Sequence, residues 1–256
     1  MLLAIDIGNT QTVIGLYGKD KLLHHWRLET KKERTADEWG VFLKELFQFE
    51  NKTLSEVHGV VISNVVPAMQ RAIREMCSKY VGIEPVYVGP KIKIDMPIAT
   101  DNPSEVGADR IVNAVAAFHR FKTDLIIVDF GTATTFDYIS NEGEYQGGLI
   151  LPGVGISANA LFSHAAQLPR IEITKPKNVV GKNTIECMQS GIYYGYVGMV
   201  DSVVERIEEE IGQKCKVIAT GGFASLMVPD SKRINEVCEF LTLEGLKLIY
   251  DWNERQ

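Results

Sequence analysis

Leu2-Leu-Ala-Ile-Asp-Ile-Gly-Asn9, near the start of the chain, matches a second block, Leu125-Ile-Ile-Val-Asp-Phe-Gly-Thr132. In each block an apolar run predicts a buried strand, an aspartate stands near its end, and a glycine lets the chain turn. The flanking order agrees as well, because both blocks open three hairpin-linked strands that are followed by a helix. The repeat predicts an α/β fold of two homologous halves, residues 1–117 and 118–256.

Composition places the chain among packed globular proteins. Of its 256 residues 45% are hydrophobic, and 27 Lys and Arg stand against 33 Asp and Glu, for a formal net charge of −6. The apolar fraction is sufficient for a core, and the acidic balance gives no electrostatic footprint for nucleic acid or an anionic membrane. Four widely spaced cysteines without a Cys-x-x-Cys pair favour reduced thiols. We expect a cytoplasmic protein whose partners are small molecules or protein, with no nucleic acid and no membrane.

Helical patterns complete this outline. Residues 35–49 place apolar side chains at helical spacing, and Thr35-Ala-Asp-Glu38 has the capping-box pattern. Further helices are predicted over residues 67–80, 184–211 and, at the end of the chain, 241–252. On one side of the long helix lie three glycines, Gly191, Gly195 and Gly198. Glycine is unfavourable inside a helix, so these indicate close approach of another backbone, from the same fold or across a dimer interface.

The turn after the first strand has the composition of a phosphate-binding loop. In Asp6-Ile-Gly-Asn-Thr-Gln-Thr12, Gly8 permits a tight turn, and its neighbours supply exposed amides and short polar side chains that can hold an anion. A strand-end carboxylate beside phosphate suits Mg²⁺, which makes Asp6 a candidate ligand. One copy alone also fits an ordinary Asx turn. The second copy at Asp129 favours phosphate, with the two aspartates on opposite sides of a cleft.

A candidate base lies in Gly107-Ala-Asp-Arg110. Phosphoryl transfer to a hydroxyl needs neutralised phosphates and a base that takes the hydroxyl proton. Asp109 falls in the first turn of a predicted helix with its carboxylate away from the apolar face, where it can act as that base or only complement the helix dipole. Arg110 is equally ambiguous, since it can bind a substrate carboxylate or pair with a neighbouring acid.

Two glycine-containing segments superficially match nucleotide motifs. Gly153-Val-Gly-Ile-Ser-Ala158 is similar to a dinucleotide fingerprint, but it follows the third strand of a meander instead of the first strand of a βαβ unit. We expect it to bring a helix N-terminus towards the cleft. Gly181-Lys-Asn-Thr184 lacks the earlier glycine of a P-loop, so a P-loop is rejected.

Together these motifs resemble the type III pantothenate kinases. The resemblance covers essentially the whole chain and is carried by Asp6-x-Gly-Asn-Thr10, Asp101-Asn-Pro103, Gly107-Ala-Asp-Arg110, Asp129-Phe-Gly-Thr-Ala-Thr134, Gly147-Gly148, Pro152-Gly153 and Gly181-Lys-Asn-Thr184. It implies two ribonuclease H-like domains with a cleft between them, as in the acetate and sugar kinase, heat-shock ATPase and actin superfamily. It also implies ATP-dependent phosphorylation of pantothenate to 4'-phosphopantothenate, the first step of coenzyme A biosynthesis. Such kinases are cytoplasmic homodimers that need Mg²⁺ or another divalent cation with ATP and are activated by K⁺ or NH₄⁺.

The resemblance also implies roles for single residues. Asp109 is implied as the proton acceptor and Asp129 as the ligand of the monovalent cation. The residues implied to bind ATP are Asp6, Ile7, Gly8, Asn9, Thr10, Gln11, Thr12, Val13 and Thr132. Those implied to bind pantothenate are Gly107, Ala108, Asp109, Arg110 and Thr184. Ala219-Thr-Gly-Gly222 is similar to the superfamily's adenosine-contacting turn. One position departs from the family pattern: just before Asp101-Asn-Pro103 this chain has Thr100, where many members carry a tyrosine.

Two other functions are compatible with parts of the sequence. A nonenzymatic regulator could retain this fold, but the intact Asp6, Asp109 and Asp129 and the lack of a basic patch count against it. A kinase of another small hydroxylated acid is the second alternative, because Arg110 would suit any carboxylate.

Overall fold

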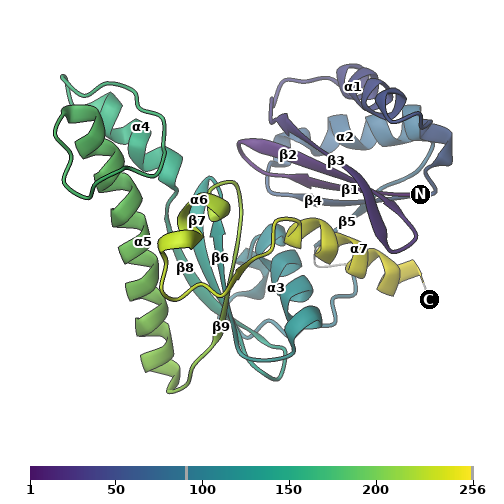
Figure 1. Ribbon diagram of the computed structural model, residues 1–256. Coiled ribbons are helices and arrows are strands. Elements are labelled where there is room, and N and C mark those ends of the chain that lie inside the picture. Colours follow the sequence, from purple (N-terminus) through teal and green to yellow (C-terminus); the bar gives the residue numbers. More distant parts are fainter. Residues whose placement is uncertain (90–91, 255–256) are drawn as a thin grey trace. The chain divides into compact units, whose positions relative to one another are not determined.

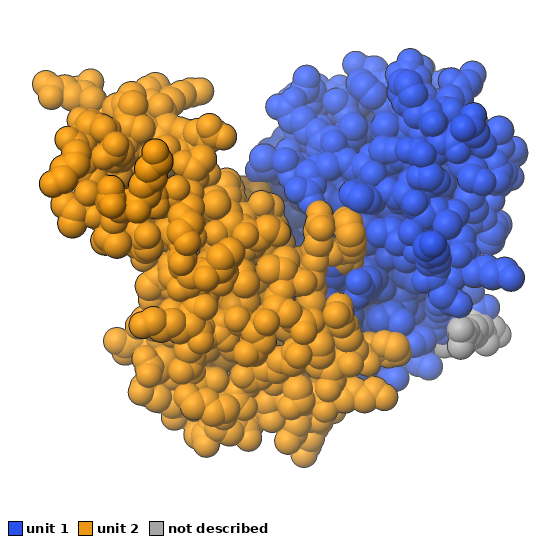
Figure 2. Space-filling view, viewed as in Figure 1, with its two compact units in different colours: residues 1–95, 102–116, 241–256 blue, residues 96–101, 117–240 orange. Residues whose placement is uncertain are grey.

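The computed structural model describes residues 1–89 and 92–254, which form two compact units (Figures 1 and 2). Unit 1 comprises residues 1–95, 102–116 and 241–256, and unit 2 comprises residues 96–101 and 117–240. This division differs from a single cut after residue 117, because the segment 96–101 and the C-terminal segment each belong to the unit of the other half.

Unit 1 is built on a five-stranded mixed sheet with the strand order β3-β2-β1-β4-β5. Its strands are β1 (Leu2–Ile7), β2 (Gln11–Gly18), β3 (Lys21–Glu29), β4 (Gly59–Asn64) and β5 (Val86–Tyr87). The hairpins β1–β2 and β2–β3 are antiparallel, whereas β4 and β5 run parallel to β1. In this register Asp6 lies between Val13 of β2 and Ser63 of β4.

Helices cover both faces of this sheet. On one face α1 (Ala36–Phe49) and α2 (Gln70–Met76) pack against the odd-numbered residues of β1 in a core that includes Ile5, Trp39 and Leu43. Side chains alternate between the faces of a strand, so Asp6 and Ser63 point to the other face, where α7 (Leu241–Glu254) lies. The predicted helix 67–80 is confirmed in extent, and its hydrogen-bond pattern changes along it, from a 3₁₀ turn at Pro67–Met69 through α2 to a π turn at Cys77–Val81.

Unit 2 repeats the same sheet, with the order β10-β9-β6-β7-β8. Its strands are β6 (Leu125–Phe130), β7 (Ala133–Ile139), β8 (Tyr145–Pro152), β9 (Lys216–Thr220) and β10 (Glu236–Val237). Again the two hairpins are antiparallel and the last two strands parallel. Asp129 lies between Thr135 and Thr220, as Asp6 lies between Val13 and Ser63 in unit 1. The predicted duplication in an α/β fold is therefore confirmed.

The helices of unit 2 are α4 (Val154–His164), α5 (Thr184–Ile211) and the short α6 (Ala224–Met227). They pack with β6 and β9 in a core that includes Val128, Tyr193 and Val200. The helix α3 (Ala108–Phe121) begins in unit 1, and the boundary between the units falls after its residue 116. Within the described residues no helix is long and apolar enough to cross a membrane.

Candidate active site

The β1–β2 turn is held in shape from inside unit 1, while its tip remains open. The Gly8 amide donates to the Gln11 carbonyl at 3.0 Å, and a Cβ on Gly8 would stand only 3.0 Å from that oxygen. Thr30 supports the turn from the end of β3, since its hydroxyl donates to the Gly8 carbonyl at 2.8 Å and its amide to the Thr10 carbonyl at 2.9 Å. Asn9, Thr10 and Gln11 are exposed. The turn therefore presents polar groups on a fixed backbone, as an anion site requires.

Thr30 is a residue that sequence reasoning missed. Its hydroxyl also lies 2.9 Å from that of the fully buried Thr12, so it links both sides of the turn to the end of β3. The strand register places Thr30 beside the turn: Gln11 pairs with Glu29, so Thr30, the residue after Glu29, must lie opposite Thr10. Such a register cannot be read before the hairpin length is known.

Beside this turn, Asp6 and Ser63 form a small polar site. They occupy paired positions of adjacent parallel strands and point to the same face of the sheet. Ser63 is fully buried, and within the described part of the chain its hydroxyl has no hydrogen-bond partner. Oxygen ligands suit Mg²⁺, which usually takes one or two carboxylates and completes its shell with water and substrate phosphates. Residues 1–89 and 92–254 hold no cluster of three or more His, Cys, Asp or Glu that could bind a metal ion.

Asp109 lies at the start of α3, and the local sequence shapes its surroundings. The helix opens with the Gly107 carbonyl accepting from the Ile111 amide at 3.2 Å. The Asp109 Oδ1 atom accepts from the Arg110 amide at 2.8 Å, and a Cβ on residue 107 would stand 2.6 Å from that oxygen. Gly107 thus leaves room for the carboxylate. Burial raises the pKa of Asp109, although the Arg110 amide and charge act in the opposite direction. A carboxylate with a raised pKa is a better proton acceptor, which suits a general base.

The turn before α3 is also ordered by its own side chains. Asn102 donates from Nδ2 to Glu105 at 2.7 Å and accepts from the Ser104 hydroxyl at 2.7 Å, around a 3₁₀ turn at Pro103–Glu105. The Asp-Asn-Pro motif therefore forms a hydrogen-bonded turn that precedes Gly107.

In unit 2 the equivalent turn is crowded with glycines. It is one residue shorter than the turn in unit 1, since Phe130 pairs with Thr134 whereas Ile7 pairs with Thr12. A Cβ on Gly153 would overlap the Thr132 carbonyl oxygen, so the first turn of α4 begins directly against the exposed Thr132. Within unit 2 the N-terminus of α4 thus lies against this turn, whereas its predicted approach to the cleft stays a prediction. A helix start beside a turn of this kind favours an anion.

Asp129 lies next to two of the glycines in this part of unit 2, Gly131 and Gly221. Gly221, which has φ +90° directly after β9, leaves no space for a Cβ, because such an atom would overlap Asp129 Oδ1. On the other side, a Cβ on Gly131 would lie 3.4 Å from the same oxygen. Two glycine turns therefore expose backbone close to this carboxylate. Ala219-Thr-Gly-Gly222, singled out in the sequence, thus contacts Asp129 through Gly221.

Thr184 lies elsewhere in unit 2, at the first residue of α5, where its side chain is exposed. The preceding Asn183 caps the helix by accepting from the Glu186 amide at 3.0 Å. Thr100, which replaces the tyrosine expected from the family pattern, has its methyl group 3.8 Å from where a Cβ on Gly147 would stand. Its hydroxyl is buried without a partner among the described residues. The structure thus gathers Asp6 with the first turn in unit 1 and Asp129 with Thr132 in unit 2.

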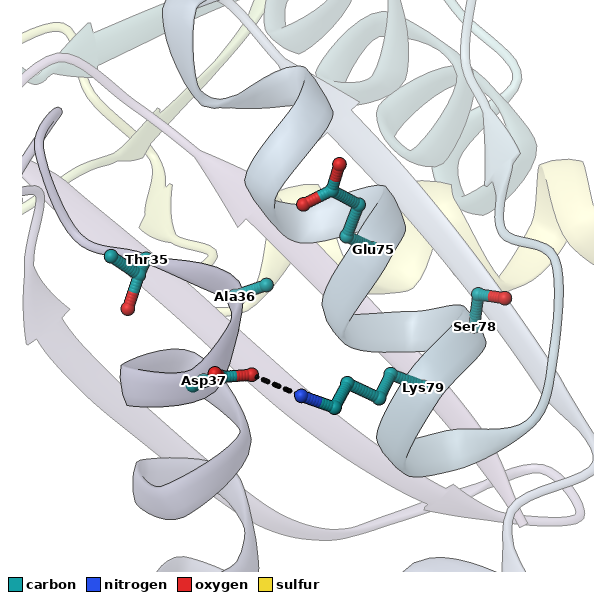
Figure 3. Close-up of a pocket in the computed structure, with 6 residues that line it drawn as sticks. All are labelled: Thr35, Ala36, Asp37, Glu75, Ser78 and Lys79. Carbon is teal, nitrogen blue, oxygen red and sulfur yellow. Dashed lines mark hydrogen bonds and ion pairs between the residues drawn. The ribbon is translucent and has the colours of Figure 1, made fainter.

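A surface groove in unit 1 is distinct from these turns (Figure 3). Its volume is about 500 Å³, and it lies between the start of α1 and the end of α2. The lining residues are Thr35, Ala36, Asp37, Glu75, Ser78 and Lys79. Lys79 pairs with Asp37 at 2.8 Å, so the main charges of the groove neutralise each other. It contains none of the candidate residues.

Comparison with known proteins assigns the family. The family model for type III pantothenate kinase matches residues 2–206. The type III pantothenate kinases of Myxococcus xanthus (strain DK1622) and Geobacter sulfurreducens are each 52% identical over 253 residues, covering 99% of both chains in each pair.

Solved structures share the fold at low identity. A Campylobacter jejuni protein described as a Baf family transcriptional activator superposes with a TM-score of 0.61 at 18% identity, covering 99% of this chain and 100% of that one. A Sinorhizobium meliloti protein described as a 2-dehydro-3-deoxygalactonokinase gives 0.58 at 11% identity, covering 100% and 96%. These likenesses support the expected pair of ribonuclease H-like domains and carry no function. On the strength of the family model and the two relatives, which span nearly the full length of the chain, this protein belongs to the type III pantothenate kinase family.

Proposed function

We propose that this chain transfers the γ-phosphoryl group of ATP to the terminal hydroxyl of pantothenate, with Asp109 as the general base. The product is 4'-phosphopantothenate, and the reaction is the first step of coenzyme A biosynthesis, in the cytoplasm. The observation that carries the assignment is the half-buried Asp109 carboxylate at the start of α3, whose pKa is raised by desolvation. The carboxylate takes the hydroxyl proton as the hydroxyl oxygen bonds to the γ-phosphorus and the bond to the ADP oxygen breaks.

The phosphates of ATP are assigned to the two turns. Residues 6–13 of unit 1 supply the fixed backbone and exposed polar side chains, and Thr132 beside the start of α4 supplies the contact in unit 2. A kinase uses ATP with a divalent metal ion, which neutralises charge on the phosphate oxygens when bound. Asp6 and Ser63 would face that ion, because their oxygens share one face of the sheet and the Ser63 hydroxyl is otherwise without a partner in the described chain.

Pantothenate binding is assigned to Gly107, Ala108, Asp109, Arg110 and Thr184. Arg110 would hold the pantothenate carboxylate through its guanidinium group, which presents a pair of N–H donors that matches a carboxylate. Gly107 keeps the space beside Asp109 open, because a Cβ at residue 107 would stand 2.6 Å from Oδ1. Thr184 offers an exposed hydroxyl at the start of α5.

A monovalent cation, K⁺ or NH₄⁺, is assigned to Asp129. The support is the close approach of the Gly131 and Gly221 backbones to its carboxylate, since backbone and carboxylate oxygens together suit a large monovalent ion. A side chain at residue 221 would occupy the space next to Oδ1.

The chain is further proposed to form a homodimer through the exposed side of α5. Apart from neighbouring atoms of α5 itself, a Cβ on Gly191, Gly195 or Gly198 would meet no atom of the described residues within 4 Å. No helix of the described chain therefore explains these glycines, whereas a second copy could approach their backbone closely.

One assay with two variables tests the proposal. Purified protein is given pantothenate, ATP and Mg²⁺ in potassium, ammonium or sodium salt, and 4'-phosphopantothenate is measured. We expect turnover in potassium or ammonium and much less in sodium, and we expect Asp109→Asn to lose about a hundredfold or more in kcat. Near-full activity of Asp109→Asn would refute the base assignment. A folded protein that phosphorylates a different hydroxylated acid and not pantothenate would overturn the substrate.

A further inference from the structure

A buried polar contact joins the C-terminal helix to the helix that carries Asp109. Asn113 of α3 is 1% exposed, and its Oδ1 atom accepts from the Thr242 hydroxyl of α7 at 2.7 Å. Both residues belong to unit 1 although they are far apart in the sequence. A directional hydrogen bond in a buried setting fixes the rotation of one helix against another better than apolar contact does.

A second contact lies one turn further along α7. Gly245 is buried, and a Cβ at this position would overlap the carbonyl oxygen of Val112 and crowd its side chain. The two helices therefore touch backbone to backbone here. Glycine is unfavourable inside a helix, so its use in α7 is explained by this close approach. Thr242 and Gly245 therefore contact two consecutive residues of α3, Asn113 and Val112 respectively.

These contacts with α7 lie one helical turn after the proposed base in α3. Residues four apart lie on one side of a helix, so Asn113 is one turn from Asp109, about 6 Å along the axis. A rotation or slide of α3 at Asn113 would be transmitted to Asp109 through one turn of continuous helix.

On its other side α7 is fixed to the sheet. A Cβ on Gly15 of β2 would stand 2.8 Å from Leu243, and one on Gly59 of β4 would overlap the ring of Tyr250. Leu243, Leu246 and Ile249 are all buried. The strand that α7 contacts through Gly15 also forms one side of the β1–β2 turn, so α7 lies between the sheet that carries this turn and α3 (Figure 1).

We propose that α7 is a positioning element for phosphoryl transfer, with Thr242 and Gly245 as positioning residues that set the place of Asp109 relative to the β1–β2 turn. The inference rests on the proposed role of Asp109 and adds to it a reason why catalysis depends on the last helix of the chain. Misplacement of a reacting group by about an ångström can lower a rate on the order of a hundredfold, so small changes in this contact should be measurable.

The test compares Thr242→Val with Thr242→Ser. Valine has nearly the same shape but cannot donate to Asn113, whereas serine keeps the hydroxyl. We expect Thr242→Val to lower kcat about tenfold, to leave the KM for ATP within about twofold, and to displace the acid limb of the kcat–pH profile, which reports the base in the enzyme–substrate complex. Thr242→Ser should restore the wild-type limb and most of kcat.

A matched control keeps stability apart from positioning. Ile73→Ala, in α2 on the opposite face of the sheet, removes a buried apolar side chain and should lower Tm without moving the acid limb. If Thr242→Val lowers Tm but keeps the wild-type kcat and profile, α7 only stabilises the fold and the inference is wrong. If Asp109→Asn is inactive and Thr242→Val keeps the wild-type kcat and profile, only the positioning role of α7 is overturned. If Asp109→Asn is active, the assignment of Asp109 as the base is overturned.

Discussion

At the scale of single residues, Asp109 shows how a site can oppose stability. Its pKa is raised because the charged form is buried, so ionisation of Asp109 favours the unfolded chain at neutral pH and protonation favours the folded one. We expect Asp109→Asn to leave Tm unchanged or to raise it at pH 7 while abolishing most turnover. Thermal unfolding at pH 7 and at a pH below the carboxyl pKa checks the sign, since the difference between variant and wild type should shrink at the lower pH. A variant that is clearly less stable at pH 7 would contradict it.

The glycines beside Asp129 allow an equally sharp comparison. Gly221→Ala places a methyl group against Asp129 Oδ1 at a positive φ, whereas Gly222→Ala places one in open space. We expect Gly221→Ala to destabilise the fold by about 1–3 kcal/mol and to raise the potassium concentration needed for half-maximal activity. Gly222→Ala should change neither by much. Titration of activity with KCl measures the potassium requirement, and thermal unfolding measures the stability. An unaltered potassium response in Gly221→Ala would exclude Asp129 as the cation ligand.

At the scale of elements, α1 begins where its sequence predicts. The Thr35 hydroxyl accepts from the Glu38 amide at 3.2 Å, and Glu38 accepts from the Thr35 amide at 2.7 Å, which completes the capping box. We expect Thr35→Ala to destabilise unit 1 by about 1 kcal/mol, which lowers Tm by roughly 2–4 °C in a protein of this size. Activity at 25 °C should be unchanged because the groove at Thr35 contains no site residue. A loss of turnover with normal folding would show that this groove serves the reaction.

The same scale shows what sequence could and could not predict. The hairpins, the capping box and the long helix α5 follow from local rules of alternation, capping and periodicity, and they were predicted closely. The change to a π turn after Met76 and the short strand β10 were missed, because their backbone depends on neighbours that no local pattern specifies. The site motifs at Asp6, Asp109 and Asp129 were visible as strand ends and a helix start. Thr30 and Thr242 were not, since each acts through a contact distant in sequence.

At the scale of the whole molecule, the long helix α5 predicts association between copies. Gly195→Ala should favour the helix itself by up to about 1 kcal/mol, but its methyl group would obstruct a close backbone contact with a second copy. We expect this variant to shift the population towards monomer in light scattering coupled to size-exclusion chromatography. Ser202→Ala, further along the exposed side of the same helix, is the matched control and should remain dimeric. A wild-type chain that is monomeric at micromolar concentration would refute the dimer.

The return of α7 to unit 1 has a consequence for how the protein is made on the ribosome. Chains emerge from the N-terminus at roughly 5–20 residues per second, and domains generally fold as they appear. Here the sheet that emerges first cannot cover its second face until the last segment has been translated, because residues 241–256 complete unit 1. During that interval the apolar surface around Gly15 and Gly59 stays uncovered and open to chaperones. Nascent chains stalled before residue 241 should therefore be more sensitive to protease in β1 to β4 than in the strands of the later unit.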